Sequence, residues 1–138
     1  MLTELEKTEI CSLLKTSKTV AVVGISSDTG KISRKIADFL VSKNYKVAGV
    51  NPAAPVIPGI PVYKSLCEIP FEIDIVNVFR KSESIGEIMP DVLKVNPKCL
   101  WLQLDIINDS AMALAFEKGI SIVQDKCILV YYNQCCPD

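Results

Sequence analysis

The sequence predicts an α/β protein built on a doubly wound, mainly parallel sheet of five or six strands with helices on both faces. Short apolar runs alternate along the chain with segments of helical periodicity, a pattern typical of strand-helix-strand units. The run Val20–Val23 is apolar at every position, as expected for a strand that is covered on both faces. The length of 138 residues predicts one domain, residues 1–138.

The amino-terminal half contains two predicted strands and two predicted helices. Thr3 and Glu6 resemble a capping box, so we expect an introductory helix within residues 1–16. A strand over 19–23 leads to a helix over 31–40, which ends near Asn44, and a second strand covers 46–50. The prolines between residues 52 and 61 then predict a stiff surface loop.

The second half repeats the alternation. We expect an extended piece at 62–63, a helical turn at 65–69, a strand at 73–79 and a helix over 84–95 that contains Pro90. A strand at 99–104 precedes a helix that is capped by Asn108 or Asp109 and stopped by Gly119. A last strand at 120–123 follows, and residues 133–138 read as a short tail.

Composition restricts the possible functions. The net charge of −1 does not favour a nucleic-acid partner. No apolar run is long enough to cross a bilayer, and the amino terminus lacks the basic start of a signal peptide, so we expect a cytoplasmic protein without membrane contact. The six cysteines show no C-x-x-C spacing, which predicts reduced thiols. Without histidine, we expect neither a metal site nor a catalytic histidine.

The junction after the first strand is the main candidate for a binding site. Gly24 permits a sharp turn, and the following helix directs amide hydrogens and its positive end beyond the strand, where an anion is stabilised. Lys31 and Arg34 add positive charge. Neither a dinucleotide fingerprint nor a complete ATP-type phosphate loop is present, because Asn51 stands where an acid would hold a ribose and Ile32 stands where a hydroxyl would bind magnesium. A plain strand-to-helix turn, capped by Ser27 or Thr29, is the simpler alternative.

Five ordered segments resemble the small stand-alone CoA-binding proteins, which are similar to the CoA-binding domain of succinyl-CoA ligase α subunits and related acyl-CoA synthetases. These segments are 22–27, 50–52, 78–80, 101–104 and 125–128. The resemblance implies a Rossmann-like fold with coenzyme A or an acyl-CoA as ligand. It implies contacts by the following residues: Gly24, Ile25, Ser26, Ser27, Lys31, Ser33, Arg34, Asn51, Pro52, Phe79 and Arg80.

The predicted function is therefore CoA binding without catalysis, because the chain offers a phosphate cradle and no catalytic set. Three alternatives stay open. They are a subunit or remnant of a CoA ligase, an NAD(P)-dependent oxidoreductase, and a scaffold with a vestigial cleft. A protein partner or a homodimer is compatible with each of them.

Overall fold

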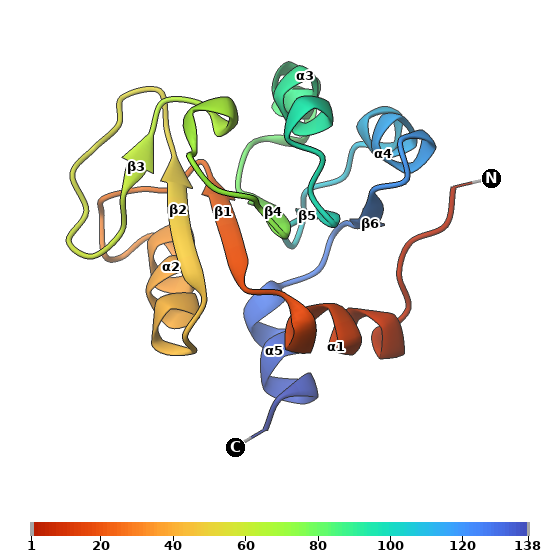
Figure 1. The fold of residues 1–138 in the computed structure, drawn as a ribbon, viewed down its shortest axis with the longest axis horizontal. Helices are drawn as coiled ribbons and strands as arrows, with labels where there is room; N and C mark the ends of the chain where they lie inside the picture. The colour runs from red at the N-terminus through yellow and green to blue at the C-terminus, as the bar shows by residue number, and fades with distance from the viewer. Residues whose placement is uncertain (1, 138) are drawn as a thin grey trace.

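The fold was obtained as a computed structural model, which describes residues 2–137. Its elements alternate between helix and strand along most of the chain (Figure 1). The strands are β1 (Thr19–Val23), β2 (Lys46–Val50), β3 (Val62–Tyr63), β4 (Ile75–Val78), β5 (Cys99–Leu102) and β6 (Ser121–Val123). The helices are α1 (Lys7–Thr16), α2 (Ile32–Ser42), α3 (Ile85–Val95), α4 (Asp109–Glu117) and α5 (Ile128–Cys135), with short 3-10 turns η1 (Leu66–Glu68) and η2 (Ser82–Ser84).

The six strands form one sheet in the order β3-β2-β1-β4-β5-β6, and every neighbouring pair is parallel. The chain moves outward from β1 to β3 and then returns to the other side of β1 with β4. Val23, at the carboxyl end of β1, is in register with Val50 of β2 and with Val78 of β4. This arrangement confirms the Rossmann-like α/β prediction and creates a topological switch point between β1 and β4, where such sheets bind ligands.

Helices cover both faces of the sheet, as predicted. In Figure 1, α3 and α4 lie above the strands, whereas α1 and α5 lie side by side below them. One buried cluster joins α3 and α4 to the sheet, and a second joins α1, α2 and α5 to the opposite face. The central strands are buried on both sides because their side chains alternate between these two clusters.

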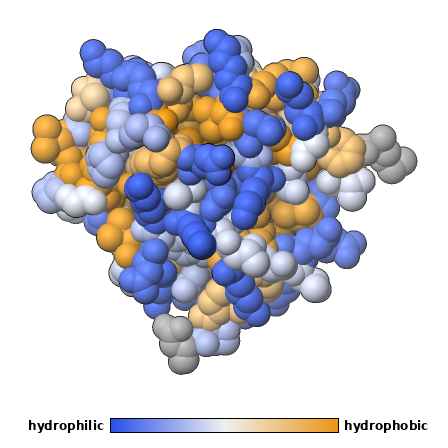
Figure 2. All heavy atoms as spheres, viewed as in Figure 1, coloured by the Kyte–Doolittle hydropathy of each residue, from blue (hydrophilic) through white to orange (hydrophobic). Residues whose placement is uncertain are grey.

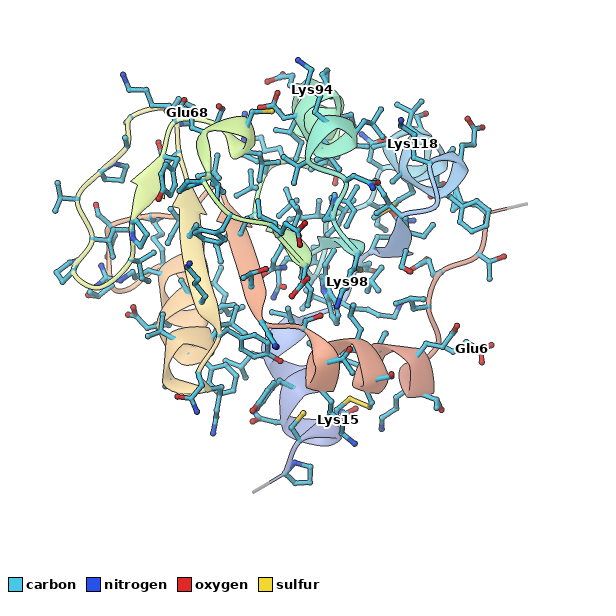
Figure 3. All side chains as sticks on the ribbon, viewed as in Figure 1. Glu6, Lys15, Glu68, Lys94, Lys98 and Lys118 are labelled. Carbon is cyan, nitrogen blue, oxygen red and sulfur yellow. A yellow bond between two sulfur atoms is a disulfide. The ribbon has the colours of Figure 1, made fainter. Side chains whose placement is uncertain are left out.

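A disulfide corrects two of the expectations for the cysteines and the carboxyl terminus. Cys11 in α1 is bonded to Cys135 in α5, so these two thiols are not reduced; the sulfur–sulfur bond is visible near Lys15 in Figure 3. The predicted tail is wrong for most of its described part, because α5 continues to Cys135 and buries that side chain. Residues 1 and 138, which belong to the predicted helix and tail segments, lie outside the described residues.

The starts of three helices can be compared with the capping signals in the sequence. The predicted capping box at Thr3 and Glu6 is wrong: α1 begins at Lys7, and the Glu6 amide donates to the Glu9 carboxylate at 3.0 Å. In contrast, Asn108 caps α4 as predicted, with its side-chain oxygen accepting from the Ala111 amide. The helix start that precedes Pro90 falls at Ile85, directly after η2.

Candidate functional site

The carboxyl end of β1 turns at Gly24 in a conformation that only glycine adopts easily. Its φ is +87°, and a Cβ there would lie 2.9 Å from the carbonyl oxygen of Phe79. The Gly24 amide donates to the Val50 carbonyl at 2.8 Å, and the Phe79 amide donates to Val23 at 2.8 Å. The ends of β1, β2 and β4 are thus held together, and the backbone at Gly24 passes close against β4.

The loop from residue 25 to residue 31 is ordered by its own short polar side chains. The Ser33 hydroxyl accepts from the Ser26 amide at 3.1 Å, and the Ser26 hydroxyl accepts from the Asp28 amide at 3.0 Å. The Asp28 carboxylate accepts from the Gly30 amide at 2.8 Å. These bonds fix the backbone before any ligand arrives, which reduces the entropy cost of binding.

Helix α2 starts at this loop and has no side-chain cap. Its N-cap residue is Lys31, whose side chain carries no acceptor, and neither Ser27 nor Thr29 occupies that position. The first amides of an α-helix have no partner within the helix, and they carry its positive partial charge. The start of α2 therefore offers donors and positive charge to an anion, reinforced by the exposed ammonium group of Lys31.

Two predicted site residues, Arg34 and Asn51, hold the loop in place through hydrogen bonds to its backbone. Arg34 donates from Nη1 to the Ser27 carbonyl at 2.8 Å and pairs with Asp38 at 3.2 Å, with 12% of its side chain exposed. The Asn51 side chain donates from Nδ2 to the Ile25 carbonyl at 2.9 Å and so ties the end of β2 to the loop.

The Ile25 side chain is itself buried. It lies over β2 so closely that a Cβ at Gly49 would be 2.7 Å from Ile25 Cγ2. Ile25, Arg34 and Asn51 therefore stabilise the conformation of the loop in this structure.

Two hollows open at this edge of the sheet and divide the remaining predicted residues between them. The first, which we call the α2-side cleft, has a volume of about 320 Å³. It is lined by Gly24, Ser26, Lys31, Ile32, Ser33, Phe79, Gln103, Leu104 and Ile106. The second, the α3-side cleft, has a volume of about 230 Å³. It is lined by Val23, Val50, Pro52, Lys64, Ser65, Leu66, Arg80, Glu87, Ile88 and Asp91.

Charge distinguishes the two clefts. Lys31 is the charged residue in the lining of the α2-side cleft, and no acidic residue lines it. In the α3-side cleft, the cations Lys64 and Arg80 are balanced by the carboxylates of Glu87 and Asp91, and Arg80 Nη2 lies 3.6 Å from that of Glu87. Because carboxylates repel an anion, the lining of the α2-side cleft is electrostatically more favourable to an anionic group than that of the α3-side cleft. Arg80 is partly neutralised by its partner.

Sequence reasoning missed a buried polar pair beneath the α2-side cleft. Asn77 lies in the middle of β4 and is fully buried, and its Nδ2 is 3.3 Å from Gln103 Oε1. Gln103, of which 4% is exposed, also lines the cleft. The available signal was an asparagine inside the apolar segment Ile75–Val78, because buried amides in strands require partners.

Other features of the described chain lie away from this edge. Burial raises the pKa of Tyr45 and that of the Cys99 thiol, and neither residue lines one of the two clefts. Within residues 2–137, no group of three or more Cys, Asp or Glu side chains is placed to hold a metal ion. In the same range, no helix combines the length and the apolar character that a bilayer crossing demands.

Comparison with known proteins identifies relatives of similar size. A family model described as a CoA binding domain matches residues 18–133. A curated relative, the uncharacterized protein YneT of Bacillus subtilis, is 35% identical over 124 residues, which are 90% of this chain and 92% of that protein. A hypothetical protein from Pyrococcus horikoshii has a solved structure with a TM-score of 0.90 and 27% identity, covering 95% of this chain and 92% of that one.

A larger protein shares the fold. The dinucleotide-forming acetyl-coenzyme A synthetase 1 of Ca. Korarchaeum cryptofilum matches 78% of this chain with a TM-score of 0.69 and 21% identity. The match covers 26% of that protein. At this identity the likeness shows a common architecture.

Proposed function

This chain belongs to the family of CoA-binding domains, and from that membership we propose that it binds coenzyme A or an acyl-CoA at the carboxyl ends of β1 and β4. The observation that carries the proposal is the combination of a close backbone turn at Gly24 with an uncapped helix start at Lys31. Together they leave amide donors and one ammonium group beside a cleft with no acidic lining.

The residues present fit a diphosphate group. The glycine at position 24 lets the end of β1 pass close to Phe79 at the edge of the cleft, and Ser26 and Ser33 bring hydroxyls to the same cleft. Lys31 would balance part of the negative charge as a flexible point charge. We assign the diphosphate to the α2-side cleft, and we assign to Pro52 and Arg80 a secondary role in the neighbouring α3-side cleft.

Nicotinamide dinucleotides fit this site less well. At the end of β2, a carboxylate normally accepts hydrogen bonds from the ribose of such cofactors, whereas this chain has Asn51. The Asn51 side chain already donates to the Ile25 carbonyl and accepts from the Ala53 amide at 2.9 Å. These contacts leave it poorly placed to replace the missing acid.

We propose a binding module rather than an enzyme, located in the cytoplasm. Without histidine, the chain has no residue for the phosphohistidine or histidine-base chemistry that CoA ligases and many transferases use. A role as one subunit of a ligase is the second possibility, and it predicts copurification with a partner that supplies the catalytic groups. Disulfides such as Cys11–Cys135 are uncommon in the cytoplasm. The redox state of these two cysteines in cells therefore tests the proposed location.

The proposal is tested by ligand-dependent melting and by calorimetric titration with CoA, acetyl-CoA, NAD, NADP and ATP. A ligand at a hundredfold excess over its Kd stabilises the folded state by about 2.7 kcal/mol, which raises the melting temperature by roughly 10 °C for a chain of this size. We expect this rise with CoA or acetyl-CoA and little change with NAD or NADP. A rise with NAD alone, or with none of the five, would overturn the proposal.

A further inference from the structure

We infer that the α2-side cleft is built for an acylated ligand: the Gln103 amide donates a hydrogen bond to a carbonyl oxygen, and Ile32 and Leu104 hold the apolar chain beyond it. The inference rests on the proposed function, since it names which form of CoA the site selects. It depends on the orientation of one amide and on the exposure of two apolar side chains.

The orientation of Gln103 is determined by its neighbours. Its Oε1 lies 3.3 Å from the backbone nitrogen of Ile128 and 3.3 Å from Asn77 Nδ2. Because a backbone N–H can only donate, the Gln103 atom that faces Ile128 must be the oxygen. The NH₂ group is therefore directed elsewhere, and no protein acceptor for it is found among residues 2–137.

The same residue borders the cleft, so its free donor is available to a ligand. Gln103 lines the α2-side cleft with only 4% of its surface exposed. The Gln103 NH₂ group is not among the described buried polar atoms that lack a partner, so it reaches the open cleft. There a carbonyl oxygen of a bound ligand can replace water as its acceptor. Asn77 acts as a positioning residue in this arrangement, because its Nδ2 holds Gln103 Oε1 from the strand below.

Apolar side chains continue the cleft where Gln103 ends. Ile32 is 57% exposed and Leu104 is 55% exposed, and Ile106 completes this apolar part of the lining. Ile32 belongs to the start of α2, and Leu104 and Ile106 belong to the segment after β5. Figure 2 shows apolar side chains in separate groups among hydrophilic ones, so single exposed residues are ordinary on this molecule. Two that flank an amide donor facing a cleft form a more specific arrangement.

An acyl thioester satisfies both features at once, which a free thiol does not. Its carbonyl oxygen accepts a hydrogen bond, whereas a thiol is only a weak acceptor. Its hydrocarbon chain would cover Ile32 and Leu104 and remove their apolar surface from water. The pantetheine arm also contains amide carbonyls that could meet Gln103, but these are common to free and acylated CoA. The two sources can therefore be separated by experiment.

The test compares the Kd values of CoA, acetyl-CoA and hexanoyl-CoA by titration calorimetry with the wild-type protein and with three variants. Gln103→Glu keeps an oxygen for Asn77 and Ile128 but removes the donor. Leu104→Ser removes the apolar wall at an exposed position. Leu114→Ser is the matched control, because Leu114 is 46% exposed on α4, which packs on the opposite face of the sheet.

We expect hexanoyl-CoA to bind about tenfold more tightly than CoA, since each partly covered methylene contributes roughly a factor of two. Gln103→Glu should weaken acyl-CoA binding about fivefold more than it weakens CoA binding, because the new carboxylate repels both ligands alike but the lost donor affects only the acylated one. Leu104→Ser should reduce the preference for hexanoyl-CoA about threefold, and Leu114→Ser should leave it unchanged.

Other outcomes separate this inference from the proposed function. If CoA binds but hexanoyl-CoA is not preferred, the inference is wrong and the proposed function stands. Equal weakening of CoA and acyl-CoA by Gln103→Glu would assign the donor to the pantetheine arm and also overturn it. If Gln103→Glu does not fold, Leu104→Ser decides alone, and an unchanged preference in that variant rejects the inference. If no CoA species binds, both fail.

Discussion

Replacing Gly24 by alanine tests the close approach of β1 to β4 that shapes the proposed binding site. An L-residue at a φ of +87° costs about 1–2 kcal/mol in backbone strain. The new Cβ would also lie 2.9 Å from the Phe79 carbonyl oxygen, and moving backbone to relieve such a contact costs about another 1–3 kcal/mol. We therefore expect Gly24→Ala to lower the free energy of unfolding by roughly 2–5 kcal/mol.

The chain offers a matched control for the strain alone. Gly59 has a φ of +79°, and a Cβ there would meet no atom within 4 Å. Gly59→Ala therefore carries the same backbone penalty without the contact, and the gain from a stiffer unfolded chain is common to both variants. Thermal and urea unfolding should show Gly24→Ala less stable than Gly59→Ala by about 1–3 kcal/mol, or roughly 4–12 °C. Equal losses in the two variants would refute the reasoning.

Three further predictions concern charge, the disulfide and pH. Lys31→Ala should weaken CoA binding about fivefold through loss of a phosphate contact, while Lys35→Ala, one turn further along α2, should not. Cys135→Ser should lower the unfolding free energy by about 3–5 kcal/mol because it opens a loop of 124 residues, whereas Cys136→Ser should change it little. Burial alone would raise the pKa of Asp74, but hydrogen bonds from two backbone amides outweigh it and the pKa is lowered. The ionised Asp74 carboxylate thus stabilises the fold above pH 3.8. Asp74→Asn should therefore melt at a lower temperature than the wild type at pH 7, and this difference should shrink as the pH falls below 3.8.

Each of these predictions has a result that would contradict it. Equal CoA affinity in the two lysine variants would remove Lys31 from the site. A wild-type melting temperature that does not respond to dithiothreitol would mean that the disulfide contributes nothing to stability. A constant difference between Asp74→Asn and the wild type from pH 7 to pH 3 would show that ionisation of this carboxyl is not linked to folding.

The fold was accessible from the sequence because its strongest signals are local. Strands such as Val20–Val23 are apolar throughout, and the caps at Asn44 and Asn108 are encoded by single residues in contact with their own helix. These features need no knowledge of distant parts of the chain. The parallel order of the strands then follows from the helical segments between them.

The features that were missed depend on residues far apart in sequence. Cys11 and Cys135 are separated by 124 positions, so no spacing rule could pair them, and the burial of Cys135 in α5 depends on contacts with α1. Likewise, the amide pair of Asn77 and Gln103 is formed only when β4 and β5 are neighbours. The division of the predicted site residues between two clefts arises from the packing of α2 and α3 on opposite faces.

The central claim is that the loop after β1 and the start of α2 bind the diphosphate of CoA. A crystal structure of the protein with CoA tests it most directly. The account predicts phosphate oxygens within hydrogen-bond distance of the backbone amides at the start of α2 and of the loop amides that donate to no protein group, with the Lys31 ammonium group beside them. Clear density for CoA at another edge of the sheet, with the α2-side cleft filled only by water, would contradict the claim.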